Sequence, residues 1–225
     1  MKTLIIAAHP DDEVLGCGGT IAKSSPNNDT YTLILGEGAT SRDITERQKK
    51  EDVNRLRKEA EHANKIIGVK KVFFESFPDN KFDTISLLSM VKTVERYVQK
   101  IKPEVIYTHH RGDLNIDHRI TFDAVLTACR PVENNPVKKI LSFEVPSSTE
   151  WNIQMASTSF NPNVFEDITK TIDRKVEAMS VYKTEVRSPP HPRSIEKIKA
   201  FAEARGGAAG MYYAEAFMLI RELRT

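Results

Sequence analysis

Cysteine, tryptophan and long apolar runs are scarce in this chain of 225 residues. Its two cysteines, Cys17 and Cys129, cannot build a disulfide framework, so we expect a reducing compartment and a cytoplasmic protein. The first apolar run, Leu4 to Ala8, is too short for the apolar core of a signal peptide. No run approaches the roughly 18 apolar residues of a membrane span, so we expect none.

Charge of one sign is also lacking. Lysine and arginine number 33 and aspartate and glutamate 31, which leaves a formal net charge of +2. This balance argues against a nucleic-acid partner, because such proteins rely on broad positive patches. Hydrophobic residues make up 40% of the chain, enough for a packed core, and the length suits one domain over residues 1–225.

Short apolar runs alternate with helical patterns along the chain. Because the runs are continuous, they predict strands buried on both faces of a parallel sheet. The expected strands cover residues 4–8, 31–35, 72–74, 104–108 and 140–145, with a final strand or helix over 216–223. The expected helices cover residues 45–68, 87–101, 117–129, 167–182 and 194–205.

Local signals support two of these helices. Thr45 and Gln48 form a capping-box pattern, and Gly68 is a typical helix end. In the helix before Pro103, apolar residues recur at spacings of four and three and predict a buried face: Leu87, Val91, Val94, Val98 and Ile101.

This alternation predicts a single-domain α/β fold, a Rossmann-like three-layer sandwich with a mostly parallel sheet. With the common strand order 3-2-1-4-5, the first and fourth strands are neighbours at the switch point, and the active site lies at their carboxyl ends.

Both of these strands are followed by clustered polar side chains. After the first come His9, Asp11, Asp12 and Glu13; after the fourth come His109, His110, Asp113, Asp117 and His118. That much buried charge is costly unless a cation compensates it. A catalytic zinc takes three ligands from such residues and keeps one open position, and His9, Asp12 and His118 supply that set.

Each of these residues also has a structural interpretation. Asp12 or Glu13 can favour the N-terminus of the following helix, and Asp117 can be an N-cap. His9 can be a strand-end histidine without a ligand role, and His118 can be a surface residue. The case for metal is their convergence from two loops.

The glycines raise a different possibility. Gly16, Gly18 and Gly19 follow the first strand, where a dinucleotide-binding fold places its phosphate loop. Their spacing does not match GxGxxG, and three acids at the helix start would repel a pyrophosphate. We expect these glycines to let the helix pack close to the sheet.

The motif "AHPDDE" (8–13) followed by a distant "DH" (117–118) resembles the PIG-L/LmbE-like N-acetylglucosaminyl deacetylases. These are zinc-dependent hydrolases that remove acyl groups from amino sugars. The likeness runs from residue 4 to about 125, with weaker similarity at "YYAEAF" (212–217). It implies removal of an N-acetyl group from an N-acetylglucosamine-type sugar, one Zn²⁺ or another divalent metal per chain, and a possible homo-oligomer.

The resemblance also implies roles for individual residues. His9, Asp12 and His118 would be the zinc ligands, Asp11 the general base, and Asp117 a carboxylate that orients a histidine.

The second motif departs from the family pattern. Many members have a histidine that assists at the oxyanion where this chain has Asn115 in "NIDH". His110 and His191 are the candidates to supply that role. "FPDN" (77–80) resembles a segment whose aspartate contacts the sugar, which nominates Asp79, and Arg57 is nearest to a family arginine of uncertain register.

Other functions remain open at this point. They are an amidase of thiol conjugates, a metal phosphoesterase, a degenerate metal- or sugar-binding module and a dinucleotide-dependent oxidoreductase. The loops expected to select the substrate, 39–44, 76–83 and 146–163, carry no readable code. Trp151, Phe160 and Phe165 can stack on a sugar, but the core or a subunit contact is the favoured interpretation.

Overall fold

A seven-stranded sheet runs through the structure, a computed structural model that describes residues 1–39 and 45–224. The strand order is β3-β2-β1-β4-β5-β7-β6. The strands are β1 (Lys2–Ala7), β2 (Asp29–Gly36), β3 (Lys71–Phe77), β4 (Val105–His109), β5 (Lys139–Phe143), β6 (Val164–Asp167) and β7 (Ala214–Glu222). The first five are parallel, and β7 is antiparallel to β5 and β6. The expected order 3-2-1-4-5 is confirmed and extended by two strands.

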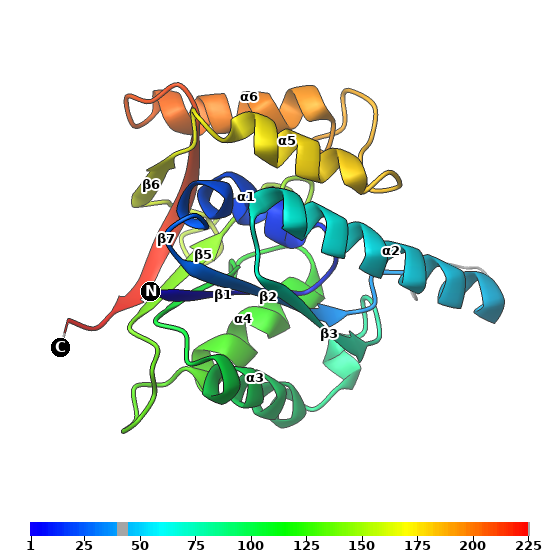
Figure 1. Ribbon diagram of the computed structural model, residues 1–225, viewed down its shortest axis with the longest axis vertical. Coiled ribbons are helices and arrows are strands. Elements are labelled where there is room, and N and C mark those ends of the chain that lie inside the picture. Colours follow the sequence, from blue (N-terminus) through cyan, green and yellow to red (C-terminus); the bar gives the residue numbers. More distant parts are fainter. Residues whose placement is uncertain (40–44, 225) are drawn as a thin grey trace.

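Helices cover both faces of this sheet. They are α1 (Asp12–Ser24), α2 (Glu46–Ile67), α3 (Leu87–Ile101), α4 (Ile116–Ala128), α5 (Ile172–Val181) and α6 (Ile195–Gly207), with a short 3₁₀ helix at Phe82–Thr84. Figure 1 shows α1, α2, α5 and α6 on one side and α3 and α4 on the other. The expected three-layer α/β sandwich is confirmed. Within the described ranges, no helix is both long and apolar enough to cross a membrane.

The central strand β1 explains why its sequence is continuously apolar. Ile5 and Ala7 belong to the core under α1 and α2, whereas Leu4 and Ile6 belong to the core under α3 and α4. Alternate side chains of a strand point to opposite faces, so a strand covered on both sides favours apolar residues at successive positions. The charge that follows at His9 therefore marks the point where the chain leaves both cores.

The expected helix ends are confirmed at α2. The Thr45 side chain accepts a hydrogen bond from the Gln48 backbone N–H, and the Gln48 side chain accepts one from the Thr45 backbone N–H. Gly68 ends the helix in the left-handed region with φ 87°.

The expected buried face of α3 is wrong at one position. Leu87 is 43% exposed at the helix start, and Met90, fully buried, packs in the core.

The helix expected over 167–182 is also corrected. It begins at Ile172, and the preceding segment is strand β6, which pairs with the start of β7. The Asp167 side chain accepts a hydrogen bond from the Thr169 backbone and turns the chain out of the strand. The partner of β6 is some fifty residues away in sequence, which local periodicity does not reveal. The segment left open as strand or helix at the end of the chain is strand β7.

The glycine-rich segment breaks α1 into two parts. Cys17 has non-helical angles (φ −147°, ψ 21°), and the backbone N–H groups of Gly19 and Thr20 donate to the Glu215 carboxylate at 2.9 and 2.7 Å. Lys175 Nζ contacts the same carboxylate at 2.6 Å. The N–H groups that a phosphate would need are therefore occupied by a side chain from β7. This disfavours the dinucleotide-binding alternative.

The prediction that glycine lets α1 pack closely on the sheet can be tested at Gly16. A Cβ there would lie 2.3 Å from the Phe143 ring on β5, whereas one at Gly207 in α6 would meet nothing within 4 Å. We expect Gly16→Ala to destabilise the fold by roughly 1–3 kcal/mol through overpacking. The control Gly207→Ala should be neutral or stabilising by up to about 1 kcal/mol. Urea unfolding measures both, and equal stability of the two variants would contradict the close packing.

Candidate metal centre and active site

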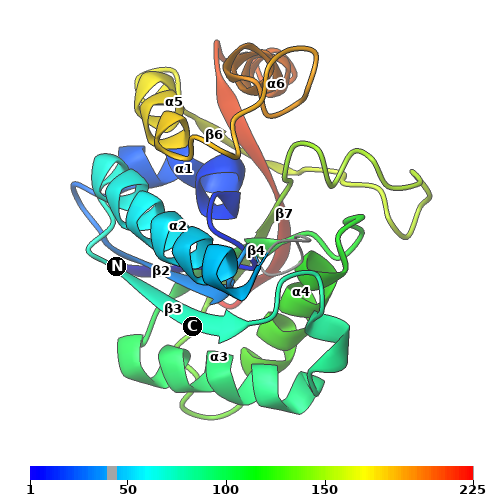
Figure 2. The ribbon, with the colours of Figure 1, turned by 90° about the vertical axis from the view of Figure 1, so that its right-hand side faces the viewer.

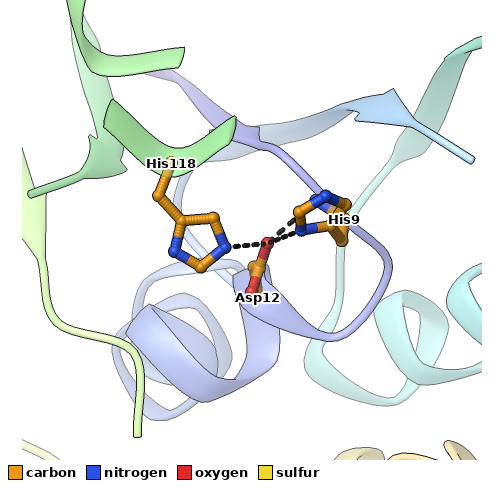
Figure 3. Close-up of side chains that lie close together, drawn as sticks. All are labelled: His9, Asp12 and His118. Atoms are coloured by element: carbon orange, nitrogen blue, oxygen red, sulfur yellow. Dashed lines mark hydrogen bonds and ion pairs between the residues drawn. The ribbon is translucent and has the colours of Figure 1, made fainter. Parts of the chain in front are cut away.

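Two turns from neighbouring parallel strands meet at the carboxyl edge of the sheet. His9 and Asp12 follow β1, and His118 lies in the first turn of α4 after β4. The Asp12 Oδ2 atom lies 3.4 Å from His9 Nδ1 and 3.3 Å from His118 Nε2, and the two imidazole centroids are 5.4 Å apart (Figure 3). The structure thus brings the three expected ligands together from sequence positions about a hundred residues apart.

These distances fit a tetrahedral metal ion. Ligand atoms about 2.0–2.1 Å from a tetrahedral zinc are roughly 3.3 Å from one another. The ligand atoms of His9, Asp12 and His118 all lie within 4.8 Å of one another. The second oxygen of Asp12, Oδ1, is buried and has no hydrogen-bond partner among the described residues. Two imidazoles and one carboxylate suit zinc, and they also suit iron or manganese.

His9 is oriented for this task by the loop before α3 and by α4. Its Nε2 atom is 2.9 Å from Asp117 Oδ2 and 3.2 Å from Asp79 Oδ1. An ionised carboxylate only accepts hydrogen bonds, so Nε2 carries the proton and Nδ1 presents a lone pair to the centre. Asp117 is itself fixed, because it accepts from the backbone N–H groups of Asn80 (2.6 Å) and Phe82 (3.0 Å).

A second group of possible ligands, His9, Asp79 and Asp117, shares His9 with the first. Both oxygens of Asp117 already accept backbone N–H bonds. Asp12 Oδ2 also accepts a backbone N–H, from His9 at 2.8 Å, but Asp12 Oδ1 has no partner among the described residues, so the first group fits a metal better. Asp117 has the geometry of the orienting carboxylate that the sequence predicted.

His118 is held from the opposite side. Its Nδ1 atom is 3.2 Å from Asp113 Oδ1, and the Asp113 carboxylate also accepts from the hydroxyls of Ser148 and Thr149. Burial lowers the pKa of His118, but the carboxylates of Asp12 and Asp113 outweigh it and raise that pKa to about 9. The metal-free centre therefore attracts positive charge.

A third imidazole lies behind the centre. His109, the last residue of β4, is fully buried and stacks on His118 with ring centroids 3.9 Å apart. Its Nε2 atom accepts a hydrogen bond from the Ala8 backbone and lies 3.5 Å from Asp12 Oδ2. Burial lowers the pKa of His109 to about 3, so this ring is neutral. It packs against the ligands and ties the end of β4 to the end of β1.

Asp11 is oriented differently from its neighbour Asp12. Its backbone lies in the left-handed region, with φ 102°, which is unusual for a residue with a side chain. The Asp11 carboxylate is buried and accepts from Arg193 Nη1 at 2.8 Å. Burial raises the pKa of Asp11 well above its usual value, and Arg193 opposes that rise.

The Glu13 carboxylate holds the turn that contains Asp11. Its carboxylate accepts from the Asp11 backbone N–H (3.1 Å), from Asn64 Nδ2 of α2 (2.8 Å) and from the Tyr182 hydroxyl that follows α5 (2.5 Å). Burial raises the pKa of Glu13 to about 7. Three donors converge on one carboxylate, so the third acid of the motif has a positioning role.

A polar cavity of about 190 Å³ opens beside the centre. It is lined by His9, Pro10, Asp11, Gly38, Asp79, Asn80, Asn115, Glu185 and Arg193. Of the residues predicted to act in the site, His9, Asp11, Asp79 and Asn115 thus lie on its wall. Asn115 is also the N-cap of α4, where its side chain accepts from the Asp117 backbone at 2.8 Å. Asp117 is therefore not the cap.

Three predicted residues lie elsewhere. His110 contacts the Thr158 carbonyl (3.0 Å) and the Phe160 ring, and His191 contacts the Arg193 backbone and the Trp151 ring. Arg57 donates to the Glu75 carbonyl and the Ser76 hydroxyl on β3. None of the three is on the cavity wall.

The three aromatic residues considered for sugar stacking differ in their exposure. Phe160 and Phe165 are half-buried, whereas Trp151 is 54% exposed. Trp151 lies on the segment that connects β5 to β6 and projects from the body of the protein (Figure 2). Residues 40–44 of the first predicted substrate loop lie outside the described residues.

Arg193 and Glu185 line the cavity but were not among the sequence predictions, and Asn80 was covered only by the predicted substrate loop 76–83. Arg193 and Glu185 come from the segment between α5 and α6, far from either motif. The one signal was the Pro-rich "SPPHPRS" (188–194), interpreted as a fixed loop. It carries Arg193 to the site.

The family model PIG-L, described as GlcNAc-PI de-N-acetylase, matches residues 4–129, more than half of the chain. The chain belongs to the PIG-L family. The match ends after α4, so it includes the residues of the metal centre but not Arg193.

Relatives of this PIG-L protein include named deacetylases. YaiS of Escherichia coli K12, itself an uncharacterized deacetylase, is 28% identical over 172 residues, covering 73% of this chain and 80% of YaiS. A Bacillus anthracis protein named probable N-acetyl-alpha-D-glucosaminyl L-malate deacetylase 2 is 23% identical over 184 residues, covering 80% of this chain and 79% of that protein.

Solved structures share the whole fold. The N,N'-diacetylchitobiose deacetylase of Pyrococcus horikoshii superimposes with a TM-score of 0.78 at 21% identity, covering 98% of this chain and 84% of that one. GalB of Pseudomonas putida, a 4-carboxy-2-hydroxymuconate hydratase, gives 0.76 at 20% identity, covering 100% and 98%. Because a hydratase has this fold, the fold alone does not define the reaction.

We expect the metal-free protein to become less stable as the pH rises. The folded pKa of His118 is raised to about 9, against about 6.5 in an unfolded chain. The imidazolium therefore stabilises the fold fully below about pH 6.5, and the contribution is lost as the pH rises through about 9. The loss is on the order of 3 kcal/mol, and His9, whose pKa is also raised, acts in the same direction.

Urea unfolding of EDTA-treated protein at about pH 6, 7.5 and 9 measures this dependence. In His118→Gln the same pH range should cause a smaller loss. A wild-type free energy of unfolding that stays constant across the range would contradict a raised folded pKa at this site.

Proposed function

We propose that this PIG-L protein is a zinc-dependent hydrolase that removes an acetyl group from an N-acetylglucosamine-type amino sugar or its conjugate. One observation carries the proposal: the metal-fitting group of His9, Asp12 and His118 lies beside a cavity whose wall includes Asp11. A neighbouring carboxylate that is not needed as a ligand is what water activation requires.

The polar residues of the cavity wall favour a hydroxyl-rich substrate. Seven of its nine lining residues are charged, amide or imidazole side chains, whereas pockets for drug-like ligands are mainly apolar. Relatives named for N-acetylglucosaminyl malate and diacetylchitobiose support the same class. We therefore propose a small sugar as the partner and Asp79 as a sugar contact. The two free cysteines support a cytoplasmic location for the enzyme.

The residues divide the reaction between them. A divalent ion, when bound by His9, Asp12 and His118, supplies a Lewis acid for the water and the acyl oxygen. Asp11 accepts a proton as the water oxygen attacks the acyl carbon. The carbon–nitrogen bond then breaks and Asp11 returns the proton to the leaving nitrogen, which gives acetic acid and the free amine. The remaining proton passes from the acid to the amine, so acetate and an ammonium group leave.

Amine release from a panel of substrates, together with metal analysis, tests this proposal. The panel comprises N-acetylglucosamine, its glycosides, a nucleotide-linked form, an N-acyl thiol conjugate and a phosphate ester. We expect turnover of at least one acetylated amino sugar that disappears with EDTA and returns with Zn²⁺. Exclusive turnover of the thiol conjugate or the phosphate ester would overturn the substrate class. Zinc binding without any turnover would favour a binding module.

Substitutions should separate metal binding from proton transfer. We expect Asp11→Asn to keep about one zinc per chain and to lose roughly 10²- to 10⁴-fold in kcat, because only the base is removed. His118→Ala should lose the zinc and the activity together. Metal analysis and kinetics on the same preparations measure the split. Purification of Asp11→Asn without metal would show that the roles are wrongly divided.

A third set of variants identifies the donor that faces the acyl oxygen. We propose Asn115, because it lies on the cavity wall at the position of the family histidine, with His110 and His191 as the alternatives. Asn115→Ala should lower kcat by roughly 10-fold or more, with smaller effects from His110→Ala and His191→Ala. A larger loss from either histidine variant would transfer the role to that residue.

A further inference from the structure

An arginine from beyond the family-matched region reaches the predicted general base. Arg193 Nη1 donates to Asp11 Oδ2 at 2.8 Å, and both residues line the cavity. Within residues 1–39 and 45–224, the next carboxylate to the same nitrogen is that of Glu185, at 3.7 Å. Arg193 lies 182 positions after Asp11 in sequence, so the contact depends on the whole fold.

The guanidinium is fixed by contacts on both sides. Arg193 Nε donates to the Ser147 hydroxyl at 2.8 Å, in the segment after β5. The Arg193 backbone N–H donates to His191 Nδ1 at 3.1 Å, and Ser194 is the N-cap of α6. The side chain is 19% exposed. A side chain held at its backbone and at two guanidinium atoms is pre-organised for one geometry.

We propose that Arg193 is a positioning residue for Asp11, holding Oδ2 so that Oδ1 is the oxygen that meets the attacking water. The inference rests on the proposed function. Glu13 fixes the Asp11 backbone through its N–H, but the side chain needs a separate constraint. Among the described residues, the side-chain hydrogen bond of Asp11 involves Oδ2 alone. A misplaced base loses rate without losing substrate affinity.

Arg193→Ala and Arg193→Lys test the proposal in the zinc-loaded protein. For Arg193→Ala we expect a kcat loss of roughly 10- to 100-fold, a KM within about 3-fold of wild type and unchanged zinc content. Arg193→Lys should recover part of the rate, since lysine restores the charge without the planar fork.

Chemical rescue distinguishes a positioning role from a structural one, because added guanidinium would not restore kcat if Arg193 only stabilised the fold. Guanidinium at about 50 mM, far below the molar range that unfolds proteins, should raise kcat of Arg193→Ala by about 5-fold or more. It should leave Asp11→Asn and the wild type unchanged. The matched control is Arg187→Ala, an exposed arginine of the same segment that does not line the cavity, which should keep wild-type kinetics.

The outcomes separate this inference from the proposed function. A wild-type protein inactive on every acetylated sugar would defeat the proposed function itself. If the wild type is active, an unchanged kcat in Arg193→Ala would overturn the positioning role. A raised KM with normal kcat would make Arg193 a substrate anchor instead, and a kcat loss that guanidinium does not repair would make it a structural ion pair.

Discussion

The structure depends on one buried carboxylate surrounded by imidazoles. Asp12 Oδ2 lies 3.3, 3.4 and 3.5 Å from nitrogens of His118, His9 and His109. An isolated buried charge costs several kcal/mol, and neutral imidazoles offer it no positive partner. Protons on the histidines can compensate it, as the raised pKa of His118 shows, and so can a divalent cation. Protons and a divalent cation would therefore compete for the same place, and metal binding at this centre would be linked to the stability of the β1–β4 edge.

The C-terminal half completes a site that the N-terminal half begins. The family match over residues 4–129 contains the three candidate ligand residues. Tyr182, Arg193 and Glu215 lie beyond it, and each reaches back to the first turn or to α1. A carboxylate accepting several hydrogen bonds in a low-dielectric interior is strongly oriented. Later parts of the chain thus act on the geometry of residues near its start, even where they supply no ligand.

Sequence reasoning succeeded where the information was local or the topology common. The apolar runs predicted five strands, and the common doubly wound order, which the structure has, placed His9 and His118 at one edge. It failed where a partner was distant. Strand β6 exists because β7 pairs with it, and Arg193 meets Asp11 across 182 positions of the sequence. No periodicity encodes either contact. The position of Leu87 was misjudged because a first-turn residue can satisfy the helical spacing and still lie beyond the core.

Asp11 and Asp12 show how adjacent, identical side chains acquire different tasks. Asp12 begins α1 with helical backbone and points to the histidines. Asp11 precedes it with φ 102°, so its side chain leaves in another direction and meets Arg193. A left-handed aspartate costs on the order of 1 kcal/mol or more, and that cost persists because Glu13 holds the Asp11 N–H. GalB shares the fold and performs a different reaction. We therefore expect local constraints of this kind to distinguish one reaction from another on this fold. They determine which carboxylate oxygen is held by a donor and which is left to meet the reacting water.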